Sequence, residues 1–198
     1  MPAERIILGA SGLIGQELIR CFGMTGTIGT CCTSGVPGLL QFDASTDSLD
    51  PLLKKLSAGS PVFFLMGMTQ IDQCARDPIG SRKLNVEIMI DHFKKVMSAG
   101  FLPVYMSSDS VFDGKNGNYV EEAKTNPLHL YGCQKLEIEQ FLLKSNEPHL
   151  VLRLPKVVCS KPQKGTLFAD WLSAINSEQE IRCATDQVFS PILLSDLS

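Results

Sequence analysis

An excess of one charge, long apolar segments and metal-ligand patterns are all missing from this sequence. Its 18 basic and 21 acidic residues give a net charge of −3, which provides no electrostatic footprint for nucleic acid or for an anionic membrane surface. The longest apolar run, Val62–Met66, is far too short to span a bilayer. No positively charged segment followed by a long apolar one precedes the first predicted strand, so we expect no signal peptide.

Cysteines are present, but not in a pattern that builds a disulfide framework or a zinc site. None form a CxxC pair, and His92, His129 and His149 are not spaced near cysteines as zinc ligands are. We therefore expect no bound metal, and reduced thiols in a cytoplasmic protein, mostly as small core residues. The cysteines are Cys21, Cys31, Cys32, Cys74, Cys133, Cys159 and Cys183.

The sequence does contain an alternation of strand patterns and helical patterns. The predicted strands are Arg5–Gly9, Thr27–Cys32, Pro61–Met66, Leu102–Met106 and His149–Leu154. The predicted helices are Gly12–Phe22, Leu49–Leu56, Arg82–Ser98 and Leu130–Leu143. Apolar strands that alternate with helices predict an α/β protein of the Rossmann type, a doubly wound parallel sheet with helices on both faces.

The pattern weakens after Pro155. We expect residues 1–155 to form an NAD(P)-binding domain and residues 156–198 to belong to an incomplete substrate-binding lobe. In that region we predict a helix at Thr166–Ile175, a short strand at Glu180–Ala184 and the beginning of a helix within Pro191–Leu197. Because the chain stops inside this last pattern, we expect a truncated sequence.

A glycine-rich turn connects the first predicted strand to the first predicted helix. Glycines in this context allow a tight turn and a close approach of the backbone to a pyrophosphate, which the helix N-terminus attracts. The spacing is GxxGxxG, and the alternative is a tight turn that serves packing alone. The predicted coenzyme-binding residues of the turn are Gly9, Ser11, Gly12, Leu13, Ile14 and Gly15.

The residues at the end of the second predicted strand indicate which dinucleotide the domain binds. An acid at its end would hold the ribose hydroxyls of NAD, but no acid stands there. Thr33 and Ser34 would donate hydrogen bonds to a 2′-phosphate, which favours NADP, although both also fit an ordinary loop. Asp43 is placed to bind the adenine edge or, alternatively, to cap the following segment.

Two further segments predict a catalytic group. Tyr131 and Lys135 are four residues apart on a predicted helix and therefore share a face, where the ammonium would lower the pKa of the phenol. Ser108 follows the fourth predicted strand and would hydrogen-bond a substrate carbonyl. The alternatives are a surface tyrosine and lysine, and ordinary turn chemistry at Ser107 and Ser108.

Taken together, these motifs resemble the extended short-chain dehydrogenase/reductases, and in particular the dTDP-4-dehydrorhamnose reductase family, in the NAD-dependent epimerase/dehydratase superfamily. The segments that carry the resemblance are Ile7–Gly15, Met68–Asn85, Ser107–Gly114, Glu121–Lys135, Leu152–Arg153 and Asp186–Leu197. The chain departs from the family at Ser110, where an aromatic residue is usual, and at Pro155 and Lys156, where a polar or aromatic pair is typical beside the nicotinamide pocket.

The resemblance implies a role for each matching residue. Ser108, Tyr131 and Lys135 would form the catalytic triad, and Asn85 would help to order the lysine and its water. A second group, Met66, Gly67 and Met68, would line the path of the adenosine and its ribose.

The resemblance also implies a function: reduction of a nucleotide-linked 4-keto-6-deoxysugar by NAD(P)H, with Tyr131 as the general acid. A nucleotide-sugar epimerase or dehydratase shares the same triad, and a regulatory subunit that binds the dinucleotide without turning it over is a third alternative. The expected partner is a small nucleotide-sugar, and helices such as Arg82–Ser98 and Leu130–Leu143 would suit a homodimer.

Overall fold

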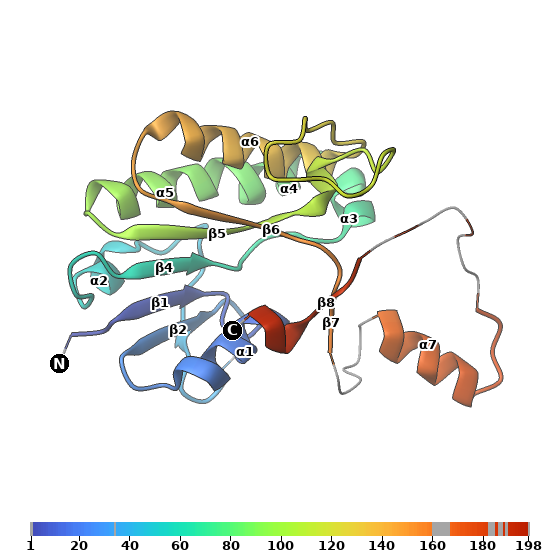
Figure 1. Ribbon diagram of the computed structural model, residues 1–198. Coiled ribbons are helices and arrows are strands. Elements are labelled where there is room, and N and C mark those ends of the chain that lie inside the picture. The colour runs from blue at the N-terminus through green and yellow to red at the C-terminus, as the bar shows by residue number, and fades with distance from the viewer. Residues whose placement is uncertain are drawn as a thin grey trace. The chain divides into compact units, whose positions relative to one another are not determined.

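A six-stranded parallel sheet forms the centre of the first of two compact units, Met1–Arg153 and Leu154–Ser198 (Figure 1). The computed structural model describes residues 2–33, 35–159, 167–181, 185, 188 and 190–197. The strand order is β3-β2-β1-β4-β5-β6. Because this order reverses between β1 and β4, the carboxyl ends of these strands border the crevice in which doubly wound sheets bind ligands. The predicted fold class is confirmed.

The strands and helices of the first unit have the following bounds. The strands are β1 (Arg5–Leu8), β2 (Thr27–Cys31), β3 (Leu40–Gln41), β4 (Pro61–Phe64), β5 (Leu102–Ser108) and β6 (Leu150–Leu154). The helices are α1 (Leu13–Phe22), α2 (Asp50–Leu53), α3 (Ile71–Arg76), α4 (Pro78–Arg82), the π-helix η1 (Lys83–Ile88), α5 (Met89–Ser98), the 3₁₀ turn η2 (Asp109–Val111) and α6 (Leu130–Ser145).

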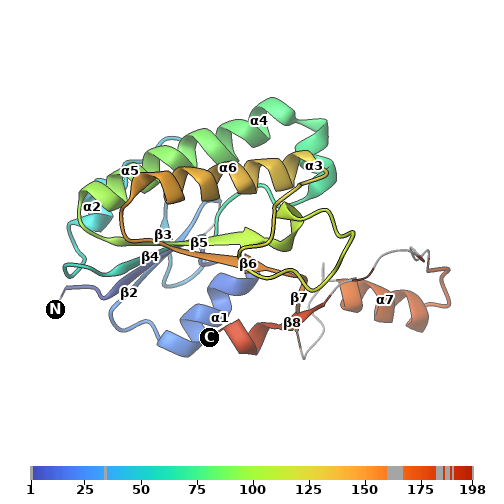
Figure 2. The same ribbon diagram turned by 45° about the horizontal axis from the view of Figure 1, so that its top comes forward.

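Helices cover both faces of this sheet, with α5 and α6 on one face and α1 on the other (Figures 1 and 2). The side chains of successive residues in β1 point to opposite faces of the sheet. Ile6 belongs to the larger core, with Phe93 of α5 and Ile138 of α6, whereas Ile7 packs with Leu18 of α1. This alternation buries both sides of the strand, which explains why the strands are continuously apolar in sequence.

The helix predicted at Arg82–Ser98 is part of a longer helical run. The run begins at Pro78, where the Asp77 carboxylate caps α4 by accepting a hydrogen bond from the Gly80 N–H at 2.9 Å. It continues through η1 and α5, and Gly100, with φ +76°, follows its end. The π-helical turn is unexpected from the sequence, and such turns occur often at functional sites.

Three short elements differ from the sequence predictions. The predicted helix at Leu49–Leu56 is α-helical only over α2, because Lys55 and Leu56 close i→i+3 turns on Leu52 and Leu53. Strand β3 was not predicted because it has only two residues, too few to show the alternation by which a strand is recognised in a sequence. Helix α3 was not predicted either.

The second unit contains β7 (Val157–Val158), α7 (Leu167–Asn176), β8 (Ile192–Leu193) and the 3₁₀ turn η3 (Leu194–Leu197). The predicted helix at the end of the chain is therefore wrong at Ile192, which pairs in parallel with Val157 and donates to the Lys156 carbonyl at 3.0 Å. Most of the strand predicted at Glu180–Ala184 lies outside the described residues. Within the described part of the chain, no helix is long and apolar enough to cross a membrane.

Candidate active site

The turn between β1 and α1 needs its glycines for different reasons. Gly9 has φ +85°, and a Cβ there would lie 3.0 Å from the Met66 nitrogen. A Cβ on Gly15 would lie 2.6 Å from the Ala10 Cα, so Gly15 permits close packing of α1 on β1. At Gly12 a Cβ would contact only the Gly9 oxygen, at 3.4 Å. Packing therefore requires Gly9 and Gly15, whereas Gly12 leaves open the approach to the N-terminus of α1.

Backbone groups at this end of α1 suit an anion. Gly12 is the N-cap residue and makes no side-chain capping bond, and the first N–H groups of a helix have no partner within it. The Gly9 N–H donates to the Thr30 hydroxyl at 3.2 Å, which ties the turn to β2. The arrangement fits a dinucleotide pyrophosphate.

The loops after β2 and β3 contain the other residues predicted to bind the adenosine. Thr33 is exposed directly after β2, and Ser34 lies outside the described residues. The Asp43 carboxylate accepts the Ser45 N–H at 2.8 Å and so closes a local turn, whereas Leu49 is the N-cap of α2, and the binding role of Asp43 stays a prediction. The sequence analysis missed His92 of α5, whose Nε2 lies 2.9 Å from the Ala44 oxygen and whose ring packs against Phe42.

Asn85, in the π-helical turn, fixes the loop that follows β4. Its Oδ1 accepts the Met68 N–H at 2.8 Å, and its Nδ2 donates to the Met68 oxygen at 2.9 Å. Gly67, with φ +140°, leaves room for this amide, because a Cβ there would lie 2.9 Å from the Asn85 Oδ1. Asn85 also hydrogen-bonds Cys74 and Gln134, and its predicted role in ordering Lys135 stays a prediction.

Ser108 and Tyr131 lie together because α6 begins very close to the end of β5. A Cβ on Gly132 would lie 2.3 Å from the Ser110 oxygen, so only glycine permits this approach. The Ser108 hydroxyl donates to Asp109 at 3.0 Å and accepts the Ser110 N–H at 3.2 Å. It also acts on the Tyr131 phenol in the direction of a lower pKa, against the larger effect of burial.

The Lys135 ammonium lies one helical turn further along α6. It donates to the Met106 oxygen at 2.7 Å and lies 4.6 Å from the centre of the Tyr105 ring and 5.6 Å from that of Tyr131. Burial lowers the pKa of Lys135 to about 8, and the Glu139 carboxylate acts in the opposite direction. The structure thus brings together all three residues of the predicted triad.

One sequence-based expectation about this group is wrong. The Lys135 ammonium was expected to lower the pKa of the Tyr131 phenol, but that pKa is raised to about 12. Burial is the main cause, since removing the phenol from water penalises the phenolate, and Cys74 and Asp109 act in the same direction. Ser108 opposes the shift without reversing it. Tyr131 is therefore a protonated phenol at neutral pH.

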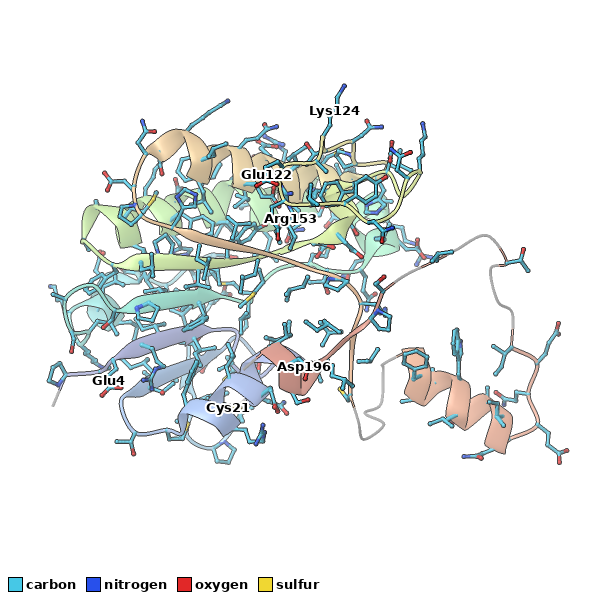
Figure 3. The ribbon with its side chains drawn as sticks, viewed as in Figure 1. Glu4, Cys21, Glu122, Lys124, Arg153 and Asp196 are labelled. Atoms are coloured by element: carbon cyan, nitrogen blue, oxygen red, sulfur yellow. The ribbon has the colours of Figure 1, made fainter. Side chains whose placement is uncertain are left out.

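A largely buried ion pair joins Glu139, one helical turn after Lys135 on α6, to Arg153 of β6. The Arg153 guanidinium contacts the Glu139 carboxylate at 2.7 Å, and the Ser107 hydroxyl donates to the same carboxylate. Arg153 also donates to the Glu121 oxygen at 2.8 Å, at the start of the loop segment that carries Glu122 and Lys124 (Figure 3). The pair therefore joins β5, α6 and β6 to the loop between β5 and α6. Arg153 belongs to one of the family-like segments, but its sequence context predicts no role for it.

The chemistry available here is proton transfer and hydrogen bonding. No group of three or more metal-ligating side chains occurs in the parts of the chain that the structure describes. A phenol that stays protonated, a serine hydroxyl beside it and a buried ammonium are suited to protonating a carbonyl oxygen.

Comparison with known proteins places this site in a family. The RmlD substrate binding domain family matches residues 4–198. The methionine adenosyltransferase 2 subunit beta of Bos taurus is 42% identical over 165 residues, 78% of this chain and 47% of the relative. The dTDP-4-dehydrorhamnose reductase of Sinorhizobium fredii is 27% identical over 162 residues, 81% of this chain and 54% of the relative.

Among solved structures, the dTDP-4-dehydrorhamnose reductase of Bacillus anthracis in complex with NADP superposes with a TM-score of 0.79 at 21% identity, over all of this chain and 68% of that one. This likeness shows the fold. The chain spans about half the length of the curated relatives it matches. Because the family match extends from residue 4 to the last residue, the chain belongs to the RmlD substrate binding domain family.

Proposed function

We propose that this chain provides the coenzyme-binding domain of an NAD(P)-dependent reductase that acts on a nucleotide-linked 4-keto-6-deoxysugar. The observation that carries the proposal is the convergence of Ser108, Tyr131 and Lys135 beside the carboxyl end of β5. The Gly9–Gly15 turn follows β1 at the same edge of the parallel sheet. Coenzyme and substrate would thus meet where ligands bind in this fold.

In this proposal the bound dinucleotide supplies the hydride, and the chain's own residues manage the proton. The Tyr131 phenol, whose pKa is about 12, holds a proton at neutral pH and donates it to the carbonyl oxygen. The Ser108 hydroxyl hydrogen-bonds the same oxygen as negative charge develops on it. The buried Lys135 ammonium adds a positive charge beside the phenol ring.

For the coenzyme, we propose NADP rather than NAD. Residues 32–38, which follow β2, contain no acid that would bind the ribose hydroxyls of NAD and repel a 2′-phosphate. Thr33 is exposed there and offers a hydroxyl. Among the structural neighbours, one is a complex with NADP and others are complexes with NAD, so the choice rests on the residues that follow β2.

The reductase is tested by titrating the protein with NADPH and NADH, and then adding a dTDP-linked 4-keto-6-deoxysugar. We expect tighter binding of NADPH and substrate-dependent loss of reduced-nicotinamide absorbance. Tyr131→Phe should abolish the oxidation and leave NADPH bound. Glu137→Gln, on the exposed side of the same helix, is the control and should leave the rate unchanged.

A second candidate function follows from the 42% identity with the subunit beta of methionine adenosyltransferase 2. In that case the chain would bind the dinucleotide and attach to a catalytic subunit instead of reducing a sugar. NADPH binding without oxidation of any 4-keto sugar nucleotide, together with co-elution with a methionine adenosyltransferase catalytic subunit, would favour this function over the reductase.

A further inference from the structure

We infer that Gln134 is a positioning residue that couples the helix of Tyr131 and Lys135 to the Met66–Met68 loop. Gln134 lies on α6 between the two predicted catalytic residues, yet its side chain points into the protein and is only 2% exposed. Its Oε1 accepts the Asn85 Nδ2–H at 2.8 Å, and its Nε2 donates to the Ser81 hydroxyl at 2.9 Å. One side chain thus joins α6 to α4 and η1.

The direction of each hydrogen bond in this network is determined by the one before it. The Ser81 hydroxyl contacts the carbonyl oxygens of Cys74 and Pro78, at 3.4 and 3.3 Å, so it donates there and accepts from Gln134. The Gln134 amide must then present its oxygen to Asn85. In turn Asn85 must present its nitrogen to Gln134, which leaves its oxygen for the Met68 N–H.

Met68 depends on this orientation because both of its main-chain polar groups bond to Asn85. The Asn85 side-chain amide accepts the Met68 N–H and donates to the Met68 oxygen, as the backbone of a neighbouring strand would. Met68 follows the exposed Gly67. Without Gln134, the Asn85 Nδ2 would retain only the Met68 oxygen and the Cys74 sulfur, a weak acceptor 3.8 Å away, and the amide would lose the side-chain partner that supports its orientation. We therefore expect the loop to loosen although Asn85 itself is intact.

A second link between the same helices provides a matched control. On the exposed side, the Arg82 guanidinium binds the Glu137 carboxylate through two hydrogen bonds of 2.8 Å. This ion pair also joins α4 to α6, but it has no contact with the Asn85 network. Glu137→Gln therefore removes an interhelical bond without changing the orientation of Asn85.

The test is hydrogen–deuterium exchange at the Met68 amide in the coenzyme-free protein, with Gln134→Met, similar in length but without hydrogen-bonding groups, and Glu137→Gln. We expect exchange at Met68 to accelerate about tenfold or more in Gln134→Met, relative to core amides of β1 and β4, and not in Glu137→Gln. Unchanged relative protection of Met68 in Gln134→Met would overturn the inference, and so would equal acceleration of the whole sheet.

This inference rests on the proposed coenzyme site for its functional meaning, so NADPH affinity is measured on the same three proteins. We expect about tenfold weaker binding in Gln134→Met and unchanged binding in Glu137→Gln. If the unaltered protein binds no dinucleotide, the proposed function fails, while the exchange at Met68 still decides whether Gln134 positions the loop. Loosening of the loop with undiminished NADPH affinity would overturn the coupling to the coenzyme site.

Discussion

The Lys135 ammonium donates its hydrogen bond to the Met106 main-chain oxygen, 2.7 Å away on β5. The lysine is thus held against the strand that carries Ser108 at its end, with its charge over two tyrosine rings. This contact joins α6 to β5. The shifted pKa values of Lys135 and Tyr131 follow from the burial that this close packing imposes.

Replacing Lys135 should change how stability depends on pH. Burial lowers its pKa to about 8 from an ordinary 10.5, so below pH 8 the folded protein bears the full cost of a buried charge. Between about pH 8 and 10.5 the unfolded chain binds more protons, and stability rises with pH. The free energy of unfolding in urea, taken as the difference between the wild type and Lys135→Met, should therefore rise by up to about 3 kcal/mol between pH 8 and 10.5. A difference independent of pH would contradict the assignment.

The Tyr131 phenol should remain protonated far above neutral pH. Its pKa is raised from 10 to about 12, so its contribution to stability is present below pH 10 and is lost between pH 10 and 12. The difference in phenolate absorbance between the wild type and Tyr131→Phe should have its midpoint near pH 12. Ionisation below pH 10 would instead support the original expectation of an activated phenolate.

Two glycines of the β1–α1 turn should differ in role, with Gly12 needed for coenzyme binding and Gly15 needed for packing. Gly12→Val has room in the free protein, so it should cost only about 1 kcal/mol, as an unfavourable N-cap residue. It should nevertheless weaken NADPH binding at least about tenfold by occupying the path of the pyrophosphate. Gly15→Ala should instead lower stability by roughly 1–3 kcal/mol, because its Cβ would overlap the Ala10 backbone. The measurements are thermal unfolding and fluorescence titration, and equal NADPH affinity for wild type and Gly12→Val would refute the placement of the pyrophosphate.

Two glutamates of α6 should differ in their importance for stability. Glu139→Gln leaves the Arg153 guanidinium without its buried counter-charge and should cost about 3 kcal/mol. Glu137→Gln breaks an exposed pair with Arg82, which solvent screens, and should cost much less. Chemical denaturation of both variants measures the two costs. Equal losses would show that the Glu139–Arg153 pair stabilises the fold no more than the exposed Arg82–Glu137 pair does.

The sequence predicted the sheet because its strands are short, apolar on both sides and separated by helical periodicity. It did not predict β3, because two residues are too few to show the alternation of a strand, nor the π-helical turn, which arises where a helix adapts to its neighbours. The end of the chain was misjudged because Ile192 pairs with Val157, far away in sequence, and this pairing overrides local helical propensity.

For the site, motif spacing identified Ser108, Tyr131 and Lys135, since residues four apart on a helix and a residue at a strand end can be placed without coordinates. The pKa of Tyr131 was predicted in the wrong direction, because desolvation depends on packing that no motif describes. Gln134 and His92 were missed for the same reason. Their importance comes from partners at Ser81, Asn85 and Ala44 that are distant in the chain.

The most direct test of a shared coenzyme and catalytic site is a crystal structure of this chain with NADPH. The account predicts that the two linked phosphates accept hydrogen bonds from the main chain between Gly12 and Gly15, with the nicotinamide ring beside the Tyr131 hydroxyl. Density for the coenzyme elsewhere, or a nicotinamide directed away from Tyr131 and Ser108, would contradict it.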